Sequence, residues 1–163
     1  MADQAKELLV AWLRDAHAME ESLETALRAQ VDHAKDNTVL RTRLQQHIIE
    51  TKDHAARMQR ALERHGSARS VMKDTGGKLQ AGMQGMMSSM SSDTAIKDVL
   101  TGVAAEHFEI ACYTSLEAAA RSVGDVELAE DCTRILADER SMAEFLESQI
   151  AATTRQELSK VGV

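Results

Sequence analysis

The sequence lacks proline and is poor in aromatic residues. Its 163 residues include no Pro, one Trp, one Tyr and two Phe, while 44% of the residues are hydrophobic. Residues that favour β-strands are therefore scarce, and no proline interrupts a helix. A chain of this length can bury one sizeable core without disulfide support. We therefore expect an all-α protein that forms a single domain over residues 1–163.

Basic residues, long apolar runs and cysteines are also few. The 19 Lys and Arg against 26 Asp and Glu give a net charge of −7, which argues against nucleic acid as a partner. The absence of a bilayer-length apolar run or a signal-type N-terminus predicts a cytoplasmic protein that does not bind a membrane. Cys112 and Cys132 are too far apart for a metal-binding CxxC motif, and we expect both to be core thiols.

Four long segments have the apolar spacing of amphipathic helices, at about 3–34, 38–65, 94–122 and 125–152. Short turns within the first and last pairs predict two antiparallel hairpins, whereas the segment 66–92 is long enough for a crossover. Within this crossover we expect one short extra helix that packs a methionine-rich face on the core. Its apolar residues at helical spacing are Leu79, Met83, Met86, Met87 and Met90.

Carboxylates interrupt the apolar face of these segments. Glu20, Glu106 and Glu139 each occupy a central position on the apolar face of the first, third and fourth segment. In the second segment, His54 lies on the corresponding face and Glu50 lies one turn before it, toward the edge. All five residues lie at similar distances from the turns near residues 36 and 124, so the pattern predicts one layer that contains them.

Several buried carboxylates need positive charge, because each uncompensated charge costs several kcal/mol. The apolar faces contain no Lys or Arg, and carboxylates with an imidazole suit iron or manganese, so the layer predicts a two-metal site. The alternative is that some of these glutamates are partly exposed, protonated, or paired with Arg43, Arg57 and Arg140.

Four stretches carry a family resemblance: LRDAHAMEESLETAL, HIIETKDHAARMQRAL, AAEHFEIACYTSLEAAA and ILADERSMAEFLE. They resemble the YciE/YciF-like branch of the ferritin-like superfamily, long catalogued as a domain of unknown function, over nearly the whole chain. The resemblance implies a ferritin-like four-helix bundle with an extra helix in the crossover. It also implies His107 as a hydrogen-bonding residue between helices rather than a ligand. The metal ligands that it implies are Glu20, Glu50, His54, Glu106, Glu109 and Glu139.

Two departures from the wider ferritin-like pattern affect the expected metal occupancy. The pattern places His three residues after Glu, whereas here Asp53 occupies that position and His54 follows it. Met142 and Ala143, the positions three and four after Glu139, offer no firm ligand for iron. We therefore expect two Fe or Mn ions, with one position weak or empty.

Such a site predicts reaction with oxygen or peroxide, and the resemblance implies a role in bacterial stress response. We expect Tyr113, two turns after Glu106 on the same face, to be structural, with a hydrogen-bond donor or a redox-active neighbour of the site as the alternatives. A homodimer is expected. Two other functions are open: a non-enzymatic scaffold or binding protein with a structural, partial or absent metal site, and iron storage in a closed cage.

Overall fold

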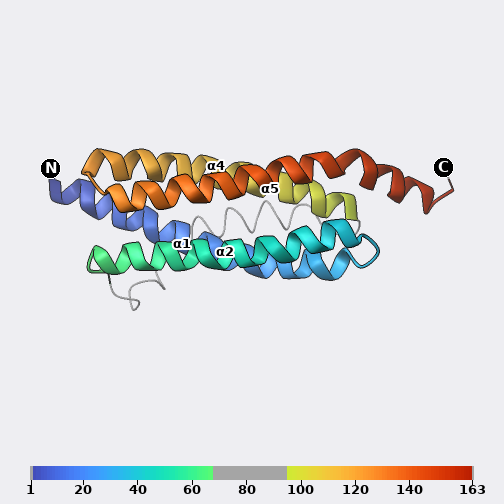
Figure 1. The fold of residues 1–163 in the computed structure, drawn as a ribbon, viewed down its shortest axis with the longest axis horizontal. Helices are drawn as coiled ribbons and strands as arrows, with labels where there is room; N and C mark the ends of the chain where they lie inside the picture. The colour runs from blue at the N-terminus through green and yellow to red at the C-terminus, as the bar shows by residue number, and fades with distance from the viewer. Residues whose placement is uncertain (1, 68–94, 163) are drawn as a thin grey trace.

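The computed structural model describes residues 2–67 and 95–162, in which four α-helices account for almost every residue and no strand occurs. The predicted all-α four-helix bundle is confirmed (Figure 1). The helices are α1 (Ala2–His33), α2 (Thr38–Arg64), α4 (Ala95–Val123) and α5 (Val126–Ser159). The expected extra helix of the crossover and its methionine face lie outside the described residues.

The helices begin and end at the polar and glycine residues that the sequence offers. Asn37 and Asp125 cap α2 and α5, because their side chains accept hydrogen bonds from the backbone N–H groups of Leu40 and Leu128. Gly66 and Gly124 follow α2 and α4 with φ angles of 72° and 79°, a left-handed conformation that favours glycine. Asn37, Gly124 and Asp125 lie in the two short turns between paired helices, whereas Gly66 follows the end of α2.

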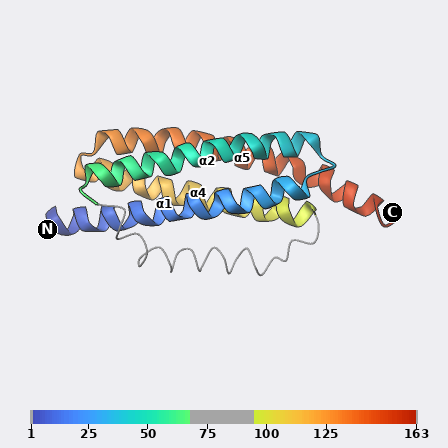
Figure 2. The ribbon, with the colours of Figure 1, turned by 90° about the horizontal axis from the view of Figure 1, so that it is seen from below.

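Each short turn produces an antiparallel hairpin, and the two hairpins pack together as a bundle. The hairpins are α1 with α2 and α4 with α5, and further contacts join α1 to α4 and α2 to α5. Figures 1 and 2 show that α2 and α4 run in the same direction. The N- and C-termini lie at opposite ends of the molecule (Figure 1).

The fourth helix is longer than predicted. The expected segment ended near residue 152, whereas α5 continues to Ser159. The polar stretch after residue 152 contains good helix formers and no helix breaker before Gly162, and Thr153 is still buried. None of the helices in the described residues is both long and apolar enough to cross a membrane.

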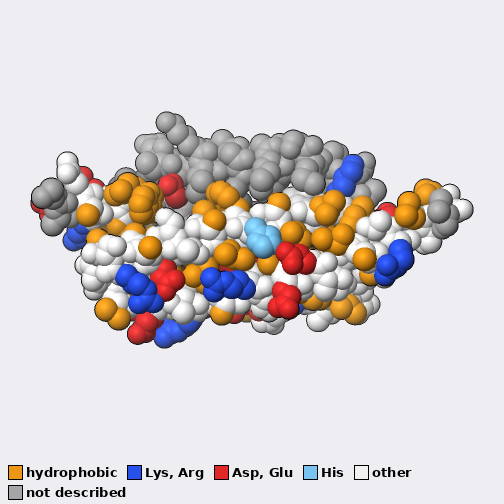
Figure 3. Space-filling view, turned by 90° about the horizontal axis from the view of Figure 1, so that it is seen from above, with side chains coloured by type: hydrophobic (Ala, Val, Ile, Leu, Met, Phe, Trp, Pro, Cys, Tyr) orange, Lys and Arg blue, Asp and Glu red, His pale blue; other side chains and the backbone are white. Residues whose placement is uncertain are grey.

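The core consists of two apolar clusters with a polar layer between them. One cluster surrounds Leu13, Met58 and Ile135, and the other surrounds Leu44 and Leu146. Cys132 is buried in the first cluster, as expected for a core thiol, whereas Cys112 is only partly buried and packs against this cluster. On the face shown in Figure 3, basic, acidic and hydrophobic side chains are interspersed. The layer between the clusters contains the buried charged residues Glu20, His47, His54, Glu106, Glu109 and Glu139.

Candidate metal centre

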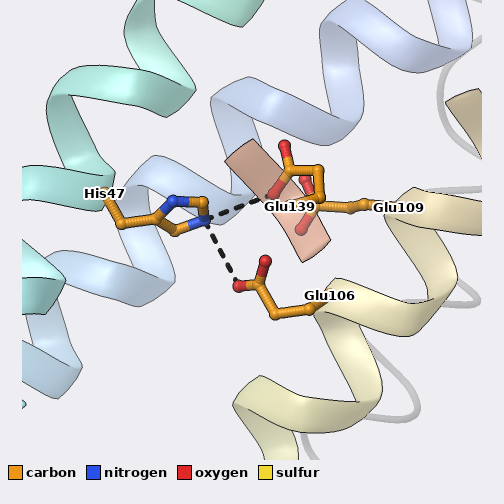
Figure 4. A group of neighbouring side chains, drawn as sticks. All are labelled: His47, Glu106, Glu109 and Glu139. Carbon is orange, nitrogen blue, oxygen red and sulfur yellow. Dashed lines mark ion pairs between the residues drawn. The ribbon is translucent and has the colours of Figure 1, made fainter. Parts of the chain in front are cut away.

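One group in this layer brings together His47 from α2, Glu106 and Glu109 from α4, and Glu139 from α5 (Figure 4). Each residue offers one ligand atom, and these atoms lie within 4.8 Å of one another. The His47 Nε2 atom lies 3.3 Å from Glu106 Oε1 and 3.5 Å from Glu139 Oε2. All four residues are buried, so the group is shielded from bulk water. We call it the His47 group.

A second group joins Glu20 from α1, His54 from α2 and the same Glu139. We call it the His54 group. The His54 Nδ1 atom lies 2.9 Å from Glu139 Oε1 and 3.7 Å from Glu20 Oε1. Glu139 therefore directs one carboxylate oxygen to each histidine, and all four helices contribute to the combined cluster. Tyr113 lies fully buried beside it and donates a hydrogen bond from its hydroxyl to Glu20 Oε1.

The structure brings five of the six predicted ligands together and places the sixth, Glu50, outside both groups. The Glu50 carboxylate, on the outer side of His47, accepts hydrogen bonds from His47 Nδ1 at 2.8 Å and Arg43 Nη1 at 2.9 Å. Glu50 as a ligand therefore remains a prediction. Sequence reasoning missed His47, although the signal was available: His47 lies on the apolar face of its segment, two turns before His54.

The apolar faces of the helices contain no Lys or Arg, and the two histidines supply positive charge instead. Burial alone would lower the pKa of His47, but the carboxylates of Glu106, Glu50 and Glu139 raise it to about 10. Burial likewise opposes protonation of His54, while Glu139 and Glu20 raise its pKa to about 11. Protons on these two imidazoles therefore offset part of the buried negative charge.

Burial and the two histidines shift the pKa values of the surrounding carboxylates in opposite directions. Burial raises the pKa of Glu139 to about 7, with Glu106 adding to the effect and His54 and His47 opposing it. Burial, together with the neighbouring carboxylates, raises the pKa of Glu109 well above its ordinary value. The pKa of Glu50 falls to about 2, because His47 and Arg43 outweigh its partial burial. Glu50 is therefore ionised at neutral pH, whereas burial favours the protonated forms of Glu109 and Glu139.

Several oxygens of the cluster are buried without an aligned hydrogen-bond partner. They are Glu20 Oε2, Glu106 Oε2 and both carboxylate oxygens of Glu139. The short contact between His54 and Glu139 is not aligned as a hydrogen bond, so His54 Nδ1 also lacks a partner. Buried polar atoms are normally satisfied, and carboxylate oxygens with imidazole nitrogens are suitable ligands for Fe or Mn. The donor set therefore fits a metal centre.

The arginines and His107 lie away from the cluster. Arg43 bonds to Glu50, and Arg57 bonds to Asp53 and Asp131 rather than to an inner glutamate. Among the described residues, no arginine pairs with any of the four inner glutamates. His107 is exposed and its Nε2 atom lies 2.8 Å from Glu147 of α5, so it links two helices as expected.

The residues that follow Glu139 provide no ligand. Met142 and Ala143 are both buried and pack as core residues in the turn after Glu139. This agrees with the expectation that α5 contributes one carboxylate and no second donor at these positions. Glu139 therefore has to serve both groups.

Comparison with known proteins supports the resemblance seen in the sequence. Residues 4–159 match the family described as Domain of unknown function (DUF892). A protein of known crystal structure from Xanthomonas campestris pv. campestris is 35% identical to this chain. The match covers 98% of this chain and 99% of that chain, with a TM-score of 0.80.

Two more distant structures share the fold. The E. coli stress protein YciF is 20% identical, with coverage of 93% and 97% and a TM-score of 0.77. YcfI from Rhodopseudomonas palustris is 23% identical, with coverage of 88% and 92% and a TM-score of 0.70. Since the family match spans nearly the whole sequence, this chain belongs to the family described as Domain of unknown function (DUF892).

Proposed function

We propose that this protein binds two Fe or Mn ions in the buried layer and reacts there with oxygen or peroxide. The observation that carries the proposal is the position of Glu139, whose Oε2 atom faces His47 and whose Oε1 atom faces His54. A carboxylate that faces two ligand groups is suited to bridge two cations. The unpartnered oxygens of Glu20 and Glu106 give each group a further donor.

The two groups divide the ligands. His47, Glu106 and Glu109 would hold one ion, Glu20 and His54 the other, and Glu139 both. Bound Fe(II) or Mn(II) supplies electrons to an oxidant, and carboxylates favour the higher oxidation state that results. The protein itself buries the ligand side chains and keeps Glu20 oriented through the Tyr113 hydroxyl.

A narrow cleft between α1 and α4 reaches this layer. Ala26, Gly102 and Ala105 line it together with His47, Glu106 and Glu109. Leu23, Leu27 and Gln30 also line it, and its volume of about 10 Å³ leaves room only for a small molecule, which supports oxygen or peroxide over a bulky organic substrate.

The second candidate function is a non-enzymatic helical protein in which a metal ion, if bound, is structural. The buried Met142 and Ala143 favour it, because they leave α5 with a single ligand. Oxygen uptake separates the two functions. Uptake above a blank on addition of Fe(II) supports the enzyme, whereas none from a folded, metal-loaded protein supports the structural role.

The primary test counts the metal ions bound per chain after anaerobic loading with Fe(II). We expect two ions in the wild type, one in Glu106→Gln, and one or none in Glu139→Gln, which affects both groups. The matched control is Glu147→Gln, because Glu147 also contacts a histidine, His107, but lies on the surface. The control should bind two ions. No binding by a correctly folded wild type would contradict the proposal.

The proposal extends to a role in bacterial stress response, which the likeness to the stress protein YciF supports. It also includes a cytoplasmic homodimer. A sedimentation or mass measurement tests the oligomer: a dimer has twice the chain mass of 17.9 kDa. A large closed assembly would instead favour iron storage.

A further inference from the structure

Each histidine of the cluster contacts a carboxylate on its outer side. The His47 Nδ1 atom lies 2.8 Å from Glu50 Oε2, while its Nε2 atom faces Glu106 and Glu139. For His54 the roles of the nitrogens are reversed: Nδ1 faces the inner carboxylates and Nε2 lies 3.1 Å from Asp138 Oδ2. Both imidazoles therefore have one nitrogen toward the cluster and the other held by an outer carboxylate.

The two outer carboxylates are held very differently. Arg43 Nη1 donates to Glu50 Oε2 at 2.9 Å, and the side chains of Arg43 and Glu50 are 18% and 19% exposed. The Asp138 side chain is 47% exposed, and His54 is its one hydrogen-bond partner within residues 2–67 and 95–162. Glu50 is thus held by His47, Arg43 and a longer hydrogen bond from Gln46 in a partly buried position, whereas the more exposed Asp138 is held by His54 alone among the described residues.

An outer carboxylate fixes the tautomer and ring orientation of a metal-binding histidine and increases its basicity. An exposed contact does this less well, because water screens it and the side chain loses entropy when held. Both effects favour the His47 group. It also offers four ligand residues, against three in the His54 group.

We propose that Glu50, held by Arg43, is a positioning residue for His47 that makes the His47 group the tighter of two unequal metal positions. The His47 group then fills first and the His54 group second. This inference rests on the proposed di-metal function and adds an order of loading. It also gives Glu50 a role other than that of a ligand.

The test is an anaerobic titration of the metal-free full chain with Mn(II), followed by electron paramagnetic resonance. The signal of unbound Mn(II) measures how much metal the protein has bound at each addition. A spin-coupled pair of bound ions gives a different spectrum from a single bound ion. We expect two steps in the wild type: first an isolated ion, then conversion to the coupled pair. One step that produces the coupled pair from the start would contradict unequal positions.

Glu50→Gln removes the outer charge and can present an amide donor to His47, which favours the wrong tautomer. We expect the first step to weaken by about 10–100-fold, so that the two steps merge. Arg43→Gln keeps the Glu50 carboxylate but removes the Arg43 hydrogen bond to it. This variant should therefore weaken the first step less than Glu50→Gln does. Asp138→Asn should affect only the second step.

Asp53→Asn is the matched control, because Asp53 also pairs with an arginine on α2, and among the described residues no ion pair joins its carboxylate to a histidine. It should leave both steps unchanged. An unaltered first step in folded Glu50→Gln would overturn the positioning role. Complete loss of one ion in this variant would instead assign Glu50 as a ligand. Both results are compatible with a di-metal site in the wild type, whereas a folded wild type that binds no Mn(II) would overturn the proposed function as well.

Discussion

The Tyr113 hydroxyl is fully buried and donates a hydrogen bond to the Glu20 carboxylate. Tyr113→Phe keeps the ring and removes this donor, which leaves a buried carboxylate oxygen with less compensation. We expect the free energy of unfolding to fall by about 1–3 kcal/mol. Urea denaturation of the metal-free protein measures this directly.

A double-mutant cycle provides the control for the Tyr113 prediction. In Glu20→Gln the buried charge is gone, so Tyr113→Phe should cost less in that background than in the wild type. Equal costs in the two backgrounds would show that Tyr113 stabilises the core through packing alone. The edge contact between the Tyr113 and His54 rings, with centroids 6.5 Å apart, would then account for its position.

The site residues differ in how well the sequence predicts them. Glu20, Glu106 and Glu139 lie at central positions of their apolar faces, so helical spacing alone brings them into the layer. Glu50 lies at the edge of its face, and there the rotamer and the nearby Arg43 decide where the carboxylate points. His47 has the required spacing, but an isolated sequence does not show that its ring faces three carboxylates from other helices.

At the scale of the helices, Gly124 ends α4 with a φ angle of 79° and an exposed position. Gly124→Ala forces an L-residue into the left-handed region, so we expect a loss of about 1–2 kcal/mol in the free energy of unfolding. The matched control is Gly162→Ala, at a φ of 87° but beyond the last helix, where the chain end can rearrange. Denaturation of both variants measures the difference, and equal losses would contradict a specific role for the turn.

Asp125 at the start of α5 provides a pH-dependent contribution to stability. Burial favours its neutral form, but the Leu128 N–H group and His65 outweigh burial and lower its pKa below 3.8. A lowered folded-state pKa stabilises the protein above the unfolded pKa, and this stability is lost as the pH falls through the folded value. Asp125→Asn keeps the cap but loses the charge, so we expect a cost of about 0.5–1 kcal/mol at pH 6.

The difference between wild type and Asp125→Asn should then shrink below pH 4 and vanish once Asp125 is protonated. Urea midpoints at several pH values between 6 and 2.5 measure it. A difference that stays constant over this range would mean that the charge of Asp125 contributes nothing and that the variant perturbs the cap itself.

Helix existence and most helix ends follow from the sequence, because Asn37, Gly66, Gly124 and Asp125 act locally. The apolar pattern ends near residue 152, whereas α5 continues to Ser159, because no residue stops the helix before Gly162. Propensity continues a helix where hydrophobic spacing no longer indicates one. The sequence pattern therefore predicts buried helix centres better than polar ends.

At the scale of the whole molecule, the charged layer lies where the two hairpins meet. Contacts within each hairpin exceed those between hairpins, and the cluster draws its ligands from all four helices. A cation held by this cluster would therefore link the two hairpins and stabilise the folded state. By linkage, a free metal concentration of 100 times Kd adds about 2.7 kcal/mol.

For a chain of this size, that contribution raises Tm by about 5–10 °C. We expect Mn(II) to raise the Tm of the wild type by this amount under anaerobic conditions, and EDTA to reverse the shift. Glu139→Gln should show little of it, because Glu139 faces both histidines, whereas the surface variant Glu147→Gln should behave as the wild type. Calorimetry measures all three proteins. An equal shift in Glu139→Gln would place the bound Mn(II) on the acidic surface, and the buried layer would then be a proton-compensated structural cluster.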